Sequence, residues 1–200
     1  MRIRLCKLLS NIFRAYLKVV EITGRVEVKN KNLINQNSMV GYWHGDSYCM
    51  QLVLKELRKY INGVNVIVTA DRRGDVIEGI LVPFGAKAIR LPDGMRMRQH
   101  FARLMDFSKE TEEVIALSLD GPLGPLHEPK KLIFVLAAES KKQVAYIRFE
   151  YKRVLRLKHR WDKYVIPLPF SSITAVVEDL GVIHKEDIRS FEKLKQRIKY

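Results

Sequence analysis

Two loops in this sequence carry ionisable side chains beside glycine, each directly after an apolar segment. His44 ends one apolar segment and is followed by Gly45 and Asp46. Asp120 follows the other segment and precedes a second glycine. An imidazole titrates near neutral pH and can take a proton from a hydroxyl group, and a nearby carboxylate can orient the ring. These loops therefore predict acid–base chemistry, although a single histidine is more often structural and Asp-Gly is also a strong turn pair.

Arginines are concentrated in the middle of the chain, where they predict contacts with phosphate. A guanidinium group binds phosphate through two parallel hydrogen bonds. A solvated basic face is the alternative interpretation. The residues concerned are Arg72, Arg73, Arg90, Arg96, Arg98 and Arg103.

The elements that must position these side chains alternate between strands and helices. Apolar, strand-like runs cover residues 25–28, 38–44, 64–68, 86–90, 114–119, 144–149 and 173–177. Helices are predicted over residues 46–60, 74–81, 95–108, 130–140 and 185–199. Residues 120–125 must form a loop because glycine and proline interrupt them, and the proline-containing stretch 164–170 leads into the last strand. The alternation predicts an α/β fold with a central, mostly parallel sheet covered by helices, and a site at the carboxyl ends of its strands.

The start of the chain predicts an appendage to a single domain. Apolar residues between Leu5 and Val20 recur at three- and four-residue spacings, so residues 1–22 are expected to form an amphipathic N-terminal helix. Residues 23–200 are expected to form one domain. The helix either packs on the core of that domain or lies in a membrane interface, with its Lys and Arg side chains meeting lipid phosphates.

The charge balance predicts an anionic partner. The chain has 36 Lys and Arg residues against 22 Asp and Glu residues, a formal net charge of +14. Nucleic acid, an anionic membrane and phosphorylated substrates all fit this charge. No nucleic acid is expected, because the sequence has no helix-turn-helix, zinc or aromatic strand motif. Two cysteines without a CxxC pair predict no metal site, and we expect no resident cofactor.

Three motifs in this order resemble a known family, the bacterial lysophospholipid acyltransferase-like proteins. The motifs are Tyr42-Trp43-His44-Gly45, then Asp120-Gly121-Pro122-Leu123-Gly124-Pro125, then Trp161-Asp162 followed by Pro167-Leu168-Pro169-Phe170. The resemblance covers about residues 25 to 180. Each motif alone is weak, but the three together are specific.

The resemblance implies an acyltransferase that moves a fatty acyl group from a thioester on coenzyme A or acyl carrier protein to a lipid hydroxyl. In that family a histidine is the base, which corresponds to His44, and a second motif binds the phosphate of the acceptor. The residues implied to bind substrate are Arg73, Arg90, Gly121, Pro122 and Gly124. The implied partners are a lipid acceptor such as a lysophospholipid, the acyl thioester and an anionic membrane surface. The implied location is peripheral, at the cytoplasmic face of the inner membrane.

The sequence departs from the family pattern at two positions. Cys49 stands five residues after His44, where the broader superfamily has the aspartate that orients the histidine. Asp46, Asp75 or Asp120 must then serve, and Asp46 ranks first because it is nearest in sequence. Leu123 replaces the usual arginine of the Asp-Gly-Pro loop. These departures fit a variant acceptor or reduced activity, and a catalytically inactive lipid-binding relative is one alternative. The net charge of +14 leaves a basic nucleic-acid-binding module as the other.

Overall fold

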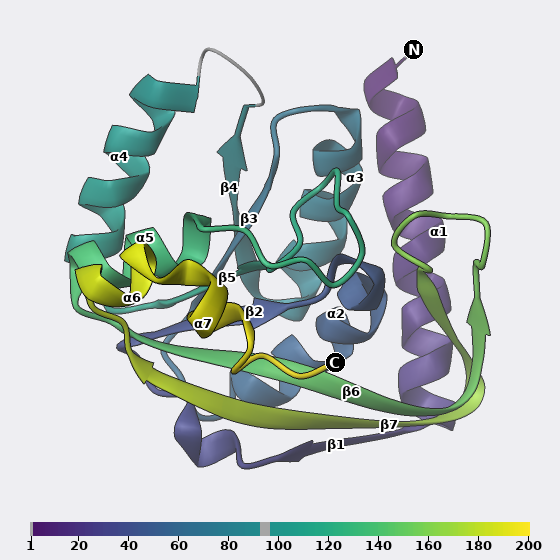
Figure 1. Ribbon diagram of the computed structural model, residues 1–200. Helices are drawn as coiled ribbons and strands as arrows, with labels where there is room; N and C mark the ends of the chain where they lie inside the picture. The colour runs from purple at the N-terminus through teal and green to yellow at the C-terminus, as the bar shows by residue number, and fades with distance from the viewer. Residues whose placement is uncertain (1, 93–96) are drawn as a thin grey trace.

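Strands and helices alternate along most of the chain, which confirms the predicted α/β class (Figure 1). The computed structural model describes residues 2–92 and 97–200, with side chains for 6–92 and 100–200. The strands are β1 (Arg25–Lys29), β2 (Ser38–Tyr42), β3 (Val64–Thr69), β4 (Ala86–Leu91), β5 (Val114–Ser118), β6 (Gln143–Arg156) and β7 (Val165–Val182). The helices are α1 (Arg2–Thr23), α2 (Ser47–Leu57), α3 (Arg72–Leu81), α4 (Met97–Glu110), α5 (Leu132–Ser140), α6 (Lys185–Arg189) and α7 (Phe191–Lys195). Short 3-10 turns are η1 (Lys31–Leu33), η2 (His44–Asp46) and η3 (Val82–Phe84).

The described strands form one sheet in the order β1-β7-β6-β2-β5-β3-β4. Neighbouring strands are parallel except β6 and β7, which form an antiparallel hairpin. Strands β6, β2 and β5 are therefore adjacent and run in one direction, so their carboxyl ends lie at the same edge of the sheet. This edge is where sites are found in open α/β sheets.

Helices cover both faces of the sheet, because successive side chains of a strand point to opposite faces. Val40 of β2 packs in a buried cluster with Val53 and Leu57 of α2. Its neighbour Met39 packs in another cluster with Phe134 of α5. Helices α4, α5 and α7 thus cover one face, while α1, α2 and α3 lie on the other (Figure 1). This arrangement explains why β2 and β5 are apolar along their whole length.

The N-terminal helix α1 exists, and it exposes apolar residues as well as burying them. Leu17 and Val20 are buried against α2, α3 and β7. Several other large apolar side chains of α1 remain exposed, namely Leu8, Leu9, Ile12, Phe13, Val19 and Ile22. Packing on the core therefore accounts for only part of the apolar periodicity.

The hairpin β6–β7 is much longer than the predicted strands 144–149 and 173–177. Residues 164–170 lead into a strand in the prediction, but almost all of them belong to β7 itself. The prolines are tolerated there because β1 pairs with β7 only at residues 172–176, which leaves the earlier part of β7 without a neighbour on that side. A register shift between Lys152 and Val154, with Arg153 at φ 62°, bends the hairpin.

Two other predicted helices differ in detail. The predicted helix 185–199 is split into α6 and α7, because Ser190 leaves the helical conformation at φ −99° and ψ 43°. The start of the predicted helix 95–108 lies outside the described residues, as do Arg96 and the side chain of Arg98.

Candidate active site

His44 and Asp120 follow the carboxyl ends of the adjacent parallel strands β2 and β5. The backbone N–H of His44 donates a hydrogen bond of 2.8 Å to Oδ1 of Asp120. The N–H of Leu119 donates to the carbonyl of Tyr42 at 2.7 Å and extends the pairing of the two strands. The structure therefore brings these two predicted residues together, with Asp120 holding the backbone at His44.

The imidazole of His44 is oriented by Asp162. Its Nδ1 lies 2.9 Å from Oδ2 of Asp162, whose carboxylate is fully buried. An ionised carboxylate has only acceptors, so Nδ1 carries a proton toward it, and in the neutral form of the ring Nε2 keeps a lone pair. The side chain of His44 is 25% exposed, so this second nitrogen belongs to a ring that solvent can reach.

Arg160 holds Asp162 from the other side through a two-pronged contact. Its Nε donates to Oδ1 at 2.9 Å and its Nη2 donates to Oδ2 at 2.8 Å. Burial alone would raise the pKa of Asp162, but the hydrogen bonds from Arg160 and His44 outweigh it and lower that pKa. Asp162 is therefore an anion at neutral pH and can stabilise a positive charge that forms on the imidazole.

Two glycines let the tip of the β6–β7 hairpin approach the other two loops. A Cβ at Gly45 would lie 2.2 Å from the carbonyl oxygen of Asp162. A Cβ at Gly124 would lie 2.4 Å from the ring of Trp161, and Gly124 has a φ of +69°. Only glycine leaves room for these contacts. The glycines beside His44 and within residues 120–125 thus let the hairpin bring Asp162 to the histidine.

Asp46 is not the carboxylate that orients His44, which corrects the choice made from sequence proximity. Tyr151 lies on β6, and its hydroxyl donates a hydrogen bond to Oδ1 of Asp46. The carboxylate that contacts the imidazole is Asp162. Burial raises the pKa of Asp46 to about 6, against the opposing effects of the Tyr151 hydrogen bond and the charge of Arg156. Cys49 is fully buried beside this pair, and burial followed by the charge of Asp46 raises the pKa of its thiol.

Asp120 supports the loop rather than the imidazole ring. Its side chain is buried, and burial raises its pKa, while the hydrogen bond from the N–H of His44 lowers it. Its Oδ2 has no hydrogen-bond partner among the described residues. Gly121, Pro122 and Gly124 follow it in the loop that contacts Trp161, so this predicted substrate loop adjoins the histidine.

Aromatic rings surround the imidazole of His44. The centroid of Trp161 lies 5.3 Å from that of His44, and the centroid of Tyr164 lies 6.4 Å away in a T-shaped contact. Tyr48 contacts Tyr164 and also Phe13 of α1. These ring contacts give His44 an apolar surrounding and connect it to the exposed N-terminal helix.

The arginines that were expected to bind phosphate are already paired with carboxylates. The guanidinium of Arg90 donates to Asp75 and Glu78, each at 2.7 Å, and also to the carbonyl of Thr69. Arg73 pairs with Asp71 at 2.6 Å. Arg90 therefore links β4 to α3, and neither arginine contacts His44, Asp120 or Asp162 in the described interactions.

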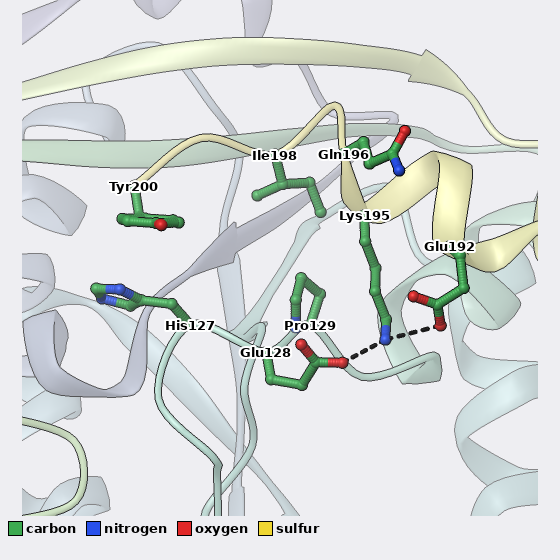
Figure 2. Close-up of a pocket in the computed structure, with 8 residues that line it drawn as sticks. All are labelled: His127, Glu128, Pro129, Glu192, Lys195, Gln196, Ile198 and Tyr200. Carbon is green, nitrogen blue, oxygen red and sulfur yellow. Dashed lines mark hydrogen bonds and ion pairs between the residues drawn. The ribbon is translucent and has the colours of Figure 1, made fainter.

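A pocket of about 420 Å³ lies beyond Trp43, next to this site. Figure 2 shows the ring of His127 beside that of Tyr200 and Lys195 between two carboxylates. His127 contacts Trp43 at 5.0 Å and Tyr200 at 4.8 Å, while Lys195 pairs with Glu128 and Glu192. In the part of the chain that the structure describes, the pocket lining includes none of the residues that contact the imidazole. No group of three metal-ligating side chains occurs among the described residues.

Sequence reasoning quoted Asp162 in the third motif but gave it no role, and it did not single out Arg160. The available signal was the Trp161-Asp162 pair that opens the third motif. No family model matches the chain. The chain is similar to an uncharacterized protein of Rickettsia prowazekii (strain Madrid E), with 23% identity over 193 residues that cover 92% of this chain and 85% of that protein.

Proposed function

We propose that the protein is an acyltransferase that moves a fatty acyl group from a thioester to a hydroxyl of a lysophospholipid or related lipid. The donor is acyl coenzyme A or an acyl carrier protein. The observation that carries the proposal is the imidazole of His44, held by the buried carboxylate of Asp162 with Nε2 left for a substrate. Position 49 is a cysteine and not an aspartate, but this does not argue against His44 as a base, because the carboxylate of Asp162 contacts the imidazole instead.

The proposed reaction uses His44 first as a base and then as an acid. Nε2 takes the proton of the acceptor hydroxyl as its oxygen attacks the thioester carbonyl carbon. The tetrahedral intermediate collapses, the C–S bond breaks, and the thiolate takes the proton back from the imidazolium. Asp162 stabilises the imidazolium and fixes its tautomer, as the carboxylate does in serine hydrolase triads. No metal or resident cofactor is required in this scheme.

We further propose that the protein acts peripherally at an anionic membrane, at the cytoplasmic face of the inner membrane. None of the helices in the described residues is both long and apolar enough to cross a bilayer. Helix α1 exposes large apolar side chains, with Ile12 54% and Phe13 38% exposed. Phe13 also contacts the ring of Tyr48, Tyr48 contacts Tyr164, and Tyr164 contacts the imidazole of His44. An apolar helix surface beside the site supports access from a lipid interface.

The test is transfer of a labelled acyl group from its thioester to a lysophospholipid, compared between the wild type and His44→Ala. We expect transfer by the wild type and a loss of about 100-fold or more in the variant, because general acid–base catalysis contributes that much. A control is Lys193→Ala, since Lys193 is exposed on α7, away from the hairpin. Equal transfer by His44→Ala and wild type, with both folded by circular dichroism, would remove His44 from the mechanism.

A further inference from the structure

The tip of the β6–β7 hairpin carries the densest group of cations near the site. We call residues 152–163 the basic hairpin. Its Lys and Arg side chains are all exposed, and its only acidic residue, Asp162, is buried. The cations are Lys152, Arg153, Arg156, Lys158, Arg160 and Lys163.

Most of these cations are not neutralised by carboxylates. Among the described residues, Arg160 is the one that forms an ion pair, with Asp162. Arg153 and Arg156 lie over the rings of Phe170 and Tyr151, and neither forms an ion pair among the described residues, although the charge of Arg156 acts on Asp46. This differs from Arg73 and Arg90, whose charges are matched by acidic neighbours. The hairpin residues that contact His44 are therefore surrounded by cations without ion-pair partners in the described part of the chain, unlike Arg73 and Arg90.

Large apolar side chains are exposed among and beside these cations. Trp161 is 37% exposed, Leu155 49% and Phe170 65%. Leu123, in the loop whose Gly124 packs on Trp161, is 78% exposed. Lys, Arg, Trp and exposed aliphatic side chains together are the composition of membrane-interface surfaces, where cations meet phosphates and apolar groups enter the acyl boundary. A soluble phosphate would use the cations but would leave the apolar side chains in water.

The basic hairpin is fixed directly to the candidate site. Its Asp162 bonds His44, and its Trp161 contacts both His44 and Gly124. Burial first, and then the charges of Lys163 and Arg156, lower the pKa of His127, which lies beyond Trp43. Strand β7, which follows the basic hairpin, borders the N-terminal helix, since the Tyr16 hydroxyl donates to the carbonyl of Pro167 at 2.8 Å (Figure 1). Lipid bound at the hairpin would therefore lie beside the imidazole.

We propose that the basic hairpin binds the phosphate groups of an anionic phospholipid surface and places His44 at that surface. The binding itself needs no catalysis, and only the use made of the bound lipid rests on the proposed acyl transfer. Lys158 and Lys163 supply charge attraction, while Leu155 and Trp161 enter the interface between the headgroups.

The experiment measures sedimentation of the full chain with vesicles of equal parts phosphatidylglycerol and phosphatidylcholine. The test variant is Lys158→Ala/Lys163→Ala, and the matched control is Lys193→Ala/Lys199→Ala, which removes the same charge from exposed positions in the C-terminal segment. Each lysine near an anionic surface contributes about fivefold to affinity, so we expect about 30-fold weaker binding for the hairpin variant. The control variant should bind as the wild type does, and vesicles of phosphatidylcholine alone should bind weakly.

Four results would overturn the proposal. These are unchanged binding by the hairpin variant, equal losses in both variants, binding of glycerol 3-phosphate in solution that matches the vesicle affinity, and tighter, hairpin-dependent binding to duplex DNA. The same measurement on His44→Ala separates the two proposals, because that variant should sediment like the wild type. If sedimentation depends on the hairpin but the wild type transfers no acyl group, the proposed acyl transfer is wrong and the proposed lipid binding is supported. If the wild type transfers acyl groups but sedimentation does not depend on the hairpin, the proposed lipid binding is wrong and the proposed acyl transfer is supported.

Discussion

At the scale of single residues, three carboxylates near His44 have three different tasks. Asp162 bonds the imidazole, Asp120 accepts the backbone N–H of His44, and Asp46 accepts from Tyr151. The pKa of each follows its partners. Arg160 and His44 together lower the pKa of Asp162, whereas burial raises those of Asp46 and Asp120. Proximity in sequence therefore does not identify the carboxylate that contacts the imidazole, because long-range packing decides the partner of each side chain.

Asp46 should make stability depend on pH. Its pKa of about 6 in the folded chain is above its ordinary value of 3.8, so folding favours the protonated form. The stability that protonation supplies is complete below about pH 4 and is lost as pH rises through 6. Asp46→Asn has no such loss. We expect its free energy of unfolding, relative to wild type, to increase by about 2 to 3 kcal/mol between pH 4 and pH 7.

Urea denaturation of both proteins across this pH range measures that difference. Parallel curves for the wild type and Asp46→Asn would show that the carboxylate does not titrate between those limits. The hydrogen bond from Tyr151 can still form with an amide oxygen, so the variant should keep the local structure.

At the scale of elements, the hairpin β6–β7 is the part that completes the site. The parallel neighbours β2 and β5 place His44 and Asp120 together, as expected from two loops after adjacent strands. The hairpin then extends past its partners and turns Asp162 toward the imidazole. Gly45 and Gly124 are where it makes its closest backbone and ring contacts.

The contact between Gly124 and Trp161 should contribute measurably to stability. Gly124→Ala would place a Cβ 2.4 Å from the Trp161 ring at a φ of +69°. Gly181→Ala is a matched control, because Gly181 has a φ of +74° and open space around its Cβ position. Both variants should lose about 1 kcal/mol from backbone strain, and Gly124→Ala should lose about 1 to 3 kcal/mol more from the clash.

Thermal and urea unfolding of the two glycine variants give this comparison. Equal losses at both positions would mean that the hairpin tip moves away freely and does not press on the loop of residues 120–125. Circular dichroism of each variant checks that the fold is kept.

At the scale of the whole molecule, the sequence predicts the layers and the sheet edge better than it predicts the site. The alternating strands and helices predict an α/β fold, because each apolar segment is long enough to be recognised as a strand or a helix from its own residues. The length of β6 and β7 escapes prediction, since Pro167 and Pro169 normally interrupt strands and are tolerated here by an unpaired strand side. The pairing of His44 with Asp162 spans 118 positions, so no local pattern contains it.

Carboxylate partners also bear on the arginines that the sequence suggests for phosphate binding. Arg73 and Arg90 stand out in the sequence, but both are paired with carboxylates. Asp71 lies two residues before Arg73, whereas Asp75 and Glu78 reach Arg90 only when α3 packs beside β4. The cations of the basic hairpin look like an ordinary charged loop until the fold brings them to the histidine. Charge composition thus predicts an anionic partner, and the surface that we propose for it rests on the tertiary structure.

The pair of His44 and Asp162 is tested by acyl-transfer rates of Asp162→Asn and Asp46→Asn beside the wild type. Asp162→Asn should lower kcat by about 10²- to 10⁴-fold, because an amide neither stabilises the imidazolium nor fixes the tautomer. Asp46→Asn should keep a rate close to that of the wild type, and unfolding curves confirm that both variants fold. A full rate in folded Asp162→Asn, or a loss confined to Asp46→Asn, would contradict the assignment of Asp162 as the carboxylate that orients the catalytic histidine.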